Sequence, residues 1–294
     1  MTRSPRDGVR RSHPSTSIVV LVGLAAALAS VLLVGGARSA SQPQGLIAFK
    51  RSDGIYLMRP DGSHVRPLKR GPGSLVARAL QPTWSPDGGR LAFAAADAIW
   101  AIADDGSDLV RVVRAEGPRS PTWSPDGRRI AFASYSAIWV VGTDGRDKRL
   151  LTVASGNPVD LDWSPAGGRI AFSNFSWDGV SVMDEDGRNV HRLAVKGGRW
   201  LDWSQDGRLI AFTELRLGAE PAISVMTAGG RNVRMLTEGW DPEWSPDGRK
   251  IAFVRGEGTA TEIFVMNADG TGVRRLTHNR VADSFPAWQP VVAP

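Results

Sequence analysis

The sequence predicts an all-β fold, a six-bladed β-propeller of four-stranded antiparallel blades, preceded by one N-terminal hydrophobic helix. Three observations predict this fold: a tryptophan-anchored repeat, four short strand-like runs within each repeat, and two incomplete repeats at the chain ends that complete one another. A propeller blade is a unit of about 40–45 residues that buries its hydrophobic faces only by stacking against its neighbours. The 294 residues provide six such units and a short N-terminal extension.

The repeat is recognised by the pattern W-S-P-D-G-x-x-[IL]-A-F, with single changes in two copies. Five long copies occur between residues 82 and 253, and a sixth, broken copy, PAWQP, begins at Pro286. The anchoring tryptophans recur at intervals of 39, 40, 40, 41 and 44 residues. They are Trp84, Trp123, Trp163, Trp203, Trp244 and Trp288. This period is that of a four-stranded propeller blade.

One repeat illustrates the four expected strands. The first, Pro121–Ser124, holds the tryptophan and leads into a Ser-Pro-Asp-Gly turn, in which Pro presets φ and Gly accepts a positive φ. The second strand is expected at Arg129–Ser134 and the third at Ala137–Val141, with apolar residues at alternate positions. An Asp-Gly hairpin turn then leads to the fourth strand, Lys148–Thr152.

The two ends of the propeller complete one blade. Residues 46–68 supply the second, third and fourth strands of a blade, and FPAWQ at 285–289 supplies a tryptophan strand without the other three. An open ring would leave sheet edges exposed, whereas pairing the last strand with the first three closes it. We therefore expect residues 45–294 to form one propeller closed by the C-terminal Trp strand.

The repeated residues have structural and functional interpretations. Tryptophan in all six copies indicates packing between neighbouring blades, with an aromatic ligand platform as the alternative. The repeated Asp of S-P-D-G fits a turn better than a calcium site, because one Asp per blade does not supply several converging oxygen ligands.

This repeat resembles a known family. The pattern WSPDG-x-x-IAF, followed by IWVM-like and DG segments and an RLT-like segment, is similar to the TolB-type (WD-repeat-like) β-propeller repeat and covers residues 45–294. The resemblance implies a six-bladed propeller. TolB itself carries a separate N-terminal α/β domain, and because only about 45 residues precede the first blade here, we expect that domain to be missing.

The N-terminal segment predicts export or membrane insertion. Ile18–Val34 contains no charge and follows Arg10 and Arg11, which is typical of a segment whose N-terminus stays in the cytoplasm. We expect a short basic tail at 1–17, a signal-anchor or cleaved signal peptide at 18–37 and a linker at 38–44. A buried core helix is the remaining interpretation of the apolar run. The propeller is accordingly expected outside the cytoplasm, either membrane-anchored by a single helix or secreted.

Composition excludes several classes of function. The net charge of +6 falls mostly on the first 40 residues, which hold five basic residues and one acidic residue; the remainder holds 31 basic and 29 acidic residues. No basic stripe for nucleic acid is visible. The absence of cysteine excludes disulfides, thiolate metal sites and a cysteine nucleophile. We expect no cofactor and a monomeric propeller.

The candidate site lies where the Trp strands line the central channel. The loops between second and third strands, and between fourth and first strands, vary in sequence and share one face, so we expect the binding face there. The opposite face, with short uniform turns, is expected to be largely structural. Residues three positions and one position before each Trp should line the channel. The loop-side Trp177 and Trp240, which break the repeat pattern, are candidate aromatic anchors. The predicted binding residues are Asp160, Asp162, Trp200, Asp202, Asp241, Glu243, Trp240 and Phe285.

Such a patch could attract a cationic peptide, a metal or a sugar, or could simply hold polar residues that face water. No G-x-S-x-G, H-E-x-x-H or P-loop motif is present, and no catalytic or metal-ligating residue is assigned. The leading interpretation is a non-enzymatic extracytoplasmic scaffold that binds a protein or peptide at the cell envelope. The alternatives are a carbohydrate- or metal-binding propeller, with lyase or hydrolase activity in the central channel, and a sensor module.

Overall fold

The computed structural model describes residues 45–68, 75–176, 179–193, 197–256, 258 and 260–291. The expected cytoplasmic tail (1–17), signal-anchor or signal peptide (18–37) and linker (38–44) lie outside these residues, as does Trp177. Among the described residues, no helix combines the length and the apolar character needed to cross a bilayer.

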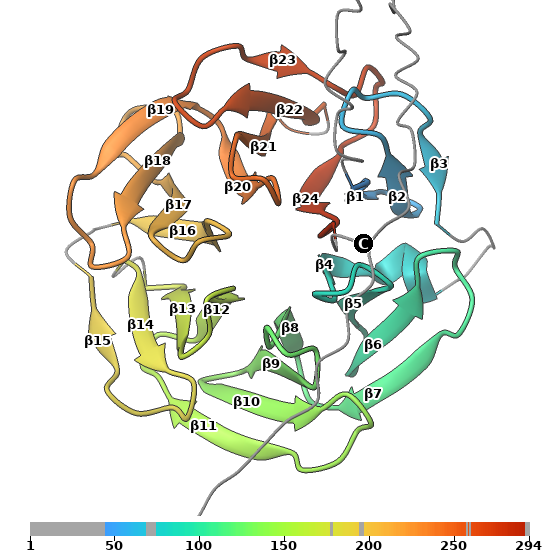
Figure 1. The fold of residues 1–294 in the computed structure, drawn as a ribbon, viewed down its shortest axis with the longest axis vertical. Helices are drawn as coiled ribbons and strands as arrows, with labels where there is room; N and C mark the ends of the chain where they lie inside the picture. The colour runs from blue at the N-terminus through green and yellow to red at the C-terminus, as the bar shows by residue number, and fades with distance from the viewer. Residues whose placement is uncertain are drawn as a thin grey trace, which may run out of the picture. The chain divides into compact units, whose positions relative to one another are not determined.

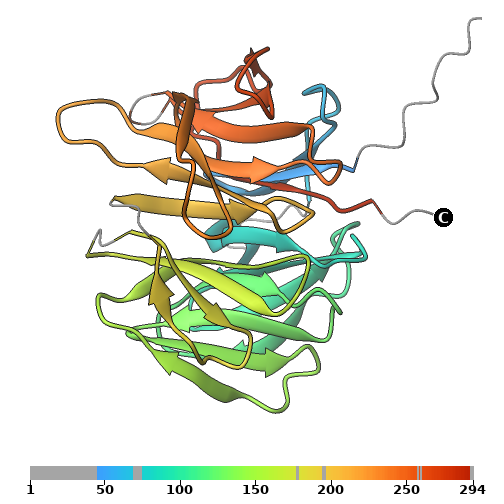
Figure 2. The ribbon, with the colours of Figure 1, turned by 60° about the vertical axis from the view of Figure 1, so that its left-hand side comes forward.

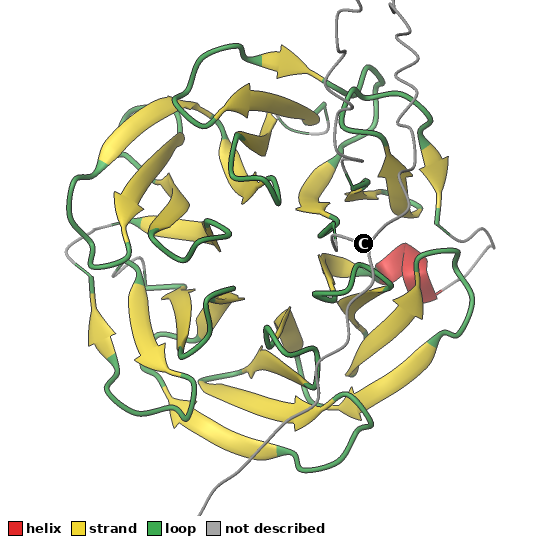
Figure 3. Ribbon diagram, viewed as in Figure 1, coloured by secondary structure: helices red, strands yellow, loops and turns green. Residues whose placement is uncertain are grey.

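The described chain forms six antiparallel sheets of four strands, arranged around a central axis (Figure 1). We number the blades from the N-terminus: blade 1 holds β24 and β1–β3, and blades 2 to 6 hold β4–β7, β8–β11, β12–β15, β16–β19 and β20–β23. Viewed obliquely, the blades are separate twisted layers (Figure 2). Strands and turns make up almost all of the described chain, with one turn of 3-10 helix, η1 (Leu75–Arg78), before β4 (Figure 3). The predicted propeller and its blade number are confirmed.

The strands occupy equivalent positions in each blade. The innermost strands are β24 (Ser284–Trp288), β4 (Leu80–Trp84), β8 (Pro118–Trp123), β12 (Pro158–Trp163), β16 (Gly198–Trp203) and β20 (Trp240–Trp244). The second strands are β1 (Ile47–Arg51), β5 (Arg90–Ala95), β9 (Arg129–Ser134), β13 (Arg169–Asn174), β17 (Leu209–Glu214) and β21 (Lys250–Arg255). The third strands are β2 (Gly54–Met58), β6 (Ala98–Ala103), β10 (Ala137–Gly142), β14 (Ser181–Asp184), β18 (Ala222–Thr227) and β22 (Glu262–Asn267). The outermost strands are β3 (Arg66–Pro67), β7 (Val110–Arg114), β11 (Arg149–Val153), β15 (His191–Arg192), β19 (Arg234–Glu238) and β23 (Arg274–Arg275).

The ring is closed by the last strand, as the sequence predicts. β24 pairs antiparallel with β1, with Trp288 opposite Ile47, so the red end of the chain lies beside its blue beginning (Figure 1). The backbone N–H of Gln289 extends the ladder by donating to the carbonyl of Leu46 (2.7 Å). The buried Asp283, just before β24, accepts from Arg51 Nε at 2.7 Å. Blade 1 is thus assembled from both ends of the propeller.

The repeated tryptophans pack between blades. All six are buried, with 2–7% of their surface exposed. Trp123 of blade 3 belongs to a hydrophobic cluster that includes Ala92, Ala94 and Ile99 of blade 2. Neighbouring arginines add cation–π contacts, as where Arg129 lies 4.9 Å from the ring centre of Trp163. The packing interpretation is therefore confirmed.

The Asp of the S-P-D-G segments holds a turn. Asp126 Oδ1 accepts from the hydroxyl of Ser124 (2.5 Å) and from the backbone N–H of Arg128 (3.0 Å). The Ser124 hydrogen bond is the main reason that the pKa of Asp126 lies below its usual value. The carboxylate oxygen is thus engaged within its own turn, as the turn interpretation predicts.

The innermost strands differ from the prediction by containing a β-bulge. In blade 3 the strand begins at Pro118, three residues before the expected start, and Ser120 and Pro121 together oppose a single residue of β9. Register shifts occur in the same pair of strands in all six blades. The bulged residue adopts the left-handed region, with φ of 47° at Ser120. A bulge leaves residues unpaired, so proline is tolerated at its second position.

Candidate functional site

Two rings of side chains line the central channel. We call the residues three positions before each tryptophan the −3 ring and those one position before it the −1 ring. The −3 ring consists of Gln81, Ser120, Asp160, Trp200, Asp241 and Phe285, all with φ between 44° and 60°. The −1 ring consists of Thr83, Thr122, Asp162, Asp202, Glu243 and Ala287. The two rings come together in space although their members are about 40 residues apart.

Most of the predicted binding residues meet at one end of this channel. A cavity of about 100 Å³ opens on the face with the variable loops, and seven of the eight line it. They are Asp160, Asp162, Trp200, Asp202, Asp241, Glu243 and Phe285. Trp240 does not line this cavity. It is half-buried at the start of β20 and packs against the hydrophobic cluster between blades 6 and 1.

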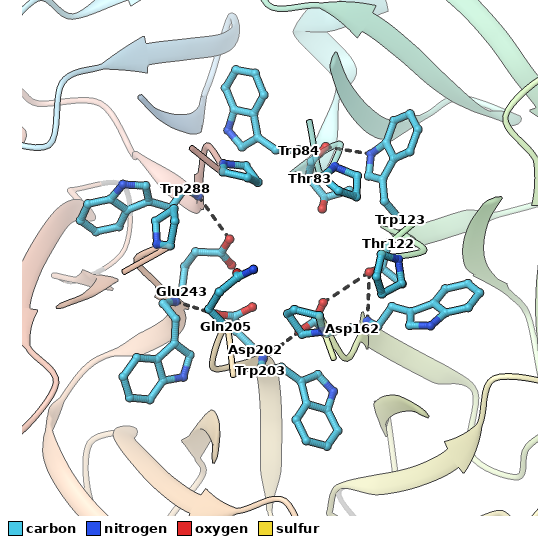
Figure 4. Close-up of a pocket in the computed structure, with 17 residues that line it drawn as sticks. Thr83, Trp84, Thr122, Trp123, Asp162, Asp202, Trp203, Gln205, Glu243 and Trp288 are labelled. Atoms are coloured by element: carbon cyan, nitrogen blue, oxygen red, sulfur yellow. Dashed lines mark hydrogen bonds between the residues drawn. The ribbon is translucent and has the colours of Figure 1, made fainter. Parts of the chain in front are cut away.

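Four of the six −1 side chains join their blade to the next one. Asp162 Oδ2 accepts from the backbone N–H of Trp203 (2.8 Å), and Asp202 Oδ2 accepts from that of Trp244 (2.6 Å). Thr122 does the same for Trp163 (3.0 Å), and Glu243 for Trp288 (3.2 Å) (Figure 4). An innermost strand is the edge strand of its sheet. Those of its N–H groups that point away from the sheet therefore need acceptors from outside the blade. The −1 side chains supply them.

Four of the six −3 side chains likewise accept a backbone N–H of the next blade. The backbone N–H groups of Ser120 and Asp160 donate to Gln81 Oε1 and Ser120 Oγ, each at 2.8 Å. Those of Trp200 and Phe285 donate to Asp160 Oδ2 (3.1 Å) and Asp241 Oδ2 (2.8 Å). The bulge turns these N–H groups toward the preceding blade. An oxygen-bearing side chain at the −3 position of that preceding blade can therefore accept them. Sequence reasoning placed these residues in the channel but missed this linking role.

Asp160 has its oxygens occupied. Its Oδ2 accepts from Arg199 Nε (2.8 Å), from the hydroxyl of Ser173 (2.7 Å) and from the N–H of Trp200. Both Asp160 and Arg199 are buried, so the pair is neutralised within the protein. Arg199 lies one residue before the −3 ring and was not among the predicted site residues. A ligand in the channel would therefore meet the other carboxyl groups first.

The remaining carboxyl groups hold protons unusually well. Burial, followed by the nearby Asp160, raises the pKa of Asp241 to about 8. Burial raises the pKa of Asp162 to about 6, and burial together with neighbouring carboxyl groups raises those of Asp202 and Glu243 well above their usual values. The carboxyl group of Asp162 is one of the neighbours that raise the pKa of Asp202. The channel can thus bind protons, cationic groups or hydrogen-bond donors.

Metal binding has less support from the geometry. Over the described part of the chain, no three His, Asp or Glu side chains are grouped in a way that could hold a metal ion. The channel carboxyl groups instead accept backbone N–H groups of the neighbouring blades. This arrangement supports hydrogen bonding and cation recognition.

The channel also opens on the face with the S-P-D-G turns. A cavity of about 160 Å³ there is larger than that on the variable face, and the two share −1 ring residues. The residues two positions after each tryptophan line it: Pro86, Pro125, Pro165, Gln205, Pro246 and Pro290. We expected this face to be largely structural. The regular spacing of these prolines after the channel-lining strand was the available signal that they ring an opening.

Comparison with known proteins agrees with the architecture. Residues 180–292 match the family model described as the TolB beta propeller domain. Over these residues the chain is similar to the TolB-type β-propeller. Among curated relatives, the Tol-Pal system protein TolB of Anaeromyxobacter dehalogenans is 49% identical over 45 residues, which is 15% of this chain and 10% of that protein. An uncharacterized peptidase, YuxL of Bacillus subtilis, is 43% identical over 51 residues, 17% of this chain and 8% of that protein.

Solved structures extend the likeness over most of the TolB-type propeller. TolB from Acinetobacter baumannii superposes with a TM-score of 0.74 and 20% identity, covering 84% of this chain and 67% of that one. A chain from the nidogen/laminin complex gives a TM-score of 0.68 at 12% identity, covering 83% and 98%. At these identities the structural likeness shows the fold alone. The sequence matches span only about a tenth of the length of the curated relatives.

Proposed function

We propose that this protein is a non-enzymatic binding scaffold of the cell envelope that holds a partner protein or peptide outside the cytoplasm, at the variable-loop mouth of its channel. The observation that carries the proposal is the meeting of Trp200, Asp241 and Phe285 on three successive innermost strands around one cavity. All three side chains are half-buried, so each still presents surface to a partner.

The chemistry of this mouth suits a peptide side chain. Aromatic residues in partly desolvated pockets are enriched among the side chains that dominate binding energy. A carboxyl group between two aromatic side chains can receive a cationic or hydrogen-bond-donating group. A cavity of about 100 Å³ admits a side chain and excludes a folded domain. The partner would therefore insert one residue and rest the remainder on the surrounding loops.

The cellular location rests on two supports. The uncharged segment at 18–34 follows two arginines, a pattern typical of export or membrane anchoring. Several sequence relatives of the propeller repeats are named Tol-Pal system protein TolB. We propose by analogy that this propeller also acts in the envelope and that its partner is an envelope protein.

Photo-crosslinking in cells tests the proposal. A photo-reactive amino acid replaces Phe285 at the mouth, and a matched control replaces Val190, which is exposed near the outer strand of blade 4. We expect ultraviolet light to give a discrete adduct with an envelope protein from position 285 and none from position 190. Equal labelling at both positions, or adducts only with cytoplasmic proteins, would reject the proposed function.

A further inference from the structure

A ladder of stacked planar side chains crosses the variable-loop face beside the channel mouth. Arg119 of blade 3 lies over the ring of Phe175 at 5.3 Å, and Arg199 of blade 5 lies 5.0 Å from the same ring. Arg199 also lies 4.9 Å from the ring of Trp200. The four residues thus form one continuous ladder, Arg119–Phe175–Arg199–Trp200, which connects blades 3, 4 and 5. Guanidinium groups stack favourably on aromatic faces.

The two arginines of this ladder differ in their charge balance. Arg199 is neutralised by the buried Asp160 at 2.8 Å. Arg119 makes only a long contact to the carbonyl of Gly117 (3.4 Å), and no carboxylate among the described residues lies within ion-pair distance of it. Among the described residues, the ladder therefore carries one positive charge without an ion-pair partner, at the end farther from Trp200.

The aromatic part of this surface is exposed, and the backbone of Phe175 is hydrogen-bonded. Phe175 keeps 49% of its surface exposed, while its backbone N–H is held by the carbonyl of Gly156 (2.9 Å). Tyr135 is 57% exposed, and a Cβ built on Gly117 would lie within 4 Å of both the Tyr135 ring and the Arg119 guanidinium. Tyr135 thus lies beside the free end of the ladder. Aromatic side chains have few rotatable bonds, so they lose little conformational freedom on binding.

We infer that this ladder is the docking surface for an acidic segment of a partner protein, in which a carboxylate pairs with Arg119 and a neighbouring aromatic side chain packs on Phe175 and Tyr135. Charge complementarity commits the site to an anion, because the Arg119 guanidinium has no ion-pair partner in the part of the chain that the structure describes. Exposed aromatic surface lies on both sides of Arg119. The partner segment therefore needs an apolar side chain next to its carboxylate to cover this surface. The inference rests on the proposed function and names the chemistry of the segment that would lie outside the channel mouth.

Peptides of defined charge test the inference on the full chain purified in detergent. The probes are fluorescently labelled acetyl-Ser-Phe-Glu-Phe-Ser-amide and the same peptide with Gln or Lys in place of Glu, and binding is followed by fluorescence anisotropy. We expect the Glu peptide to bind at least tenfold more tightly than the Gln peptide, and the Lys peptide to bind most weakly. Arg119→Gln should abolish the difference between the Glu and Gln peptides, and Arg119→Glu should make the Lys peptide the preferred one.

The controls separate charge recognition from folding. Arg128→Gln removes an exposed arginine from an S-P-D-G turn on the opposite face and should leave all three affinities unchanged. Each Arg119 variant should unfold close to the wild-type temperature, since it loses only a stacking contact on the half-exposed ring of Phe175. Equal affinities for the Glu and Gln peptides, no binding of the Glu peptide at millimolar concentration, or an unchanged preference in Arg119→Gln would overturn the inference. If one of these three results were obtained while the crosslink from position 285 persisted, the proposed function would stand. Only this docking surface would then be rejected.

Discussion

The two halves of the channel use the same backbone arrangement with different chemistry. In blades 4 to 6 the two rings contain five carboxyl groups and one tryptophan, whereas in blades 1 to 3 they contain only neutral side chains. Thr122 of the neutral half accepts the N–H of the next tryptophan at 3.0 Å, just as Asp162 of the acidic half does at 2.8 Å. A neutral oxygen is thus sufficient for the structural role. The acidic half therefore has carboxyl groups where a neutral oxygen would serve to accept the N–H of the next tryptophan.

Ring closure affects both halves equally, and its loss should have the largest effect. Deleting residues 284–294 removes β24 and exposes the edge of β1 together with the hydrophobic cluster around Ile47 and Phe49. We expect the shortened chain to lose its cooperative unfolding transition, because blade 1 would no longer seal the ring. Circular dichroism during thermal unfolding measures this. A shortened protein that melted like the intact one would contradict the closed-ring architecture.

A single inter-blade tryptophan should have the next largest effect. Trp203 is 2% exposed and packs with Val180 and Val182 of blade 4. Replacing it in Trp203→Ala should lower the free energy of unfolding by about 3–5 kcal/mol, as other buried tryptophans do. Urea titration followed by fluorescence measures the change. An exposed control, Val190→Ala just before the outer strand β15, should change stability by less than about 0.5 kcal/mol.

The fold was predictable because one pattern recurs in register, so each copy supports the interpretation of the others. The alternation of residues within the Trp strand also placed Asp162 and Asp202 in the channel. The bulge was not predicted, because residues such as Gln81 and Trp200 adopt a positive φ without the glycine that usually signals it. Proline at the following position in four of the six copies was an available signal.

The exact composition of the surface around the mouth could not be predicted. Arg199 and Phe175 meet because a β-strand of blade 5 and a loop of blade 4 converge, and no spacing in one repeat specifies that contact. Trp240 was chosen for its departure from the repeat, yet it packs between blades 6 and 1. Departures from a repeat therefore identify unusual residues without distinguishing a ligand contact from a packing contact.

The acidic half predicts a pH dependence that the neutral half would not produce. Asp162 and Asp241 have folded-state pKa values of about 6 and about 8, above the unfolded value near ~3.9. A raised pKa means that the folded state holds its protons more tightly, so the associated stability is fully present below about pH 4 and is lost as the pH rises through 6 and then 8. We expect the unfolding temperature to fall by several degrees between pH 5 and pH 9. Calorimetry in that range checks it, and a rise in unfolding temperature would contradict the pKa directions.

At lower pH the turn residues should act in the opposite direction. The pKa values of Asp87, Asp126 and Asp206 are lowered, mainly by the serine hydroxyl within each turn. Their contribution is present above the unfolded pKa and is lost as the pH falls through the folded values. Because these carboxylates are exposed, the effect should be smaller than that of the channel. The wild-type protein should therefore be most stable at about pH 4.

The unfolding temperature at pH 8 of a variant with a neutral channel tests the comparison most directly. In Asp162→Asn, Asp202→Asn, Glu243→Gln, each side chain keeps an oxygen that can accept the N–H of the next tryptophan. If the carboxyl charge is additional to the structural role, this variant should melt at the same temperature as the wild type or higher, and its dependence on pH should flatten. A variant that melted several degrees lower at pH 8 would show that the charges themselves hold blades 4, 5, 6 and 1 together, and the separation of structural acceptor from functional charge would be wrong.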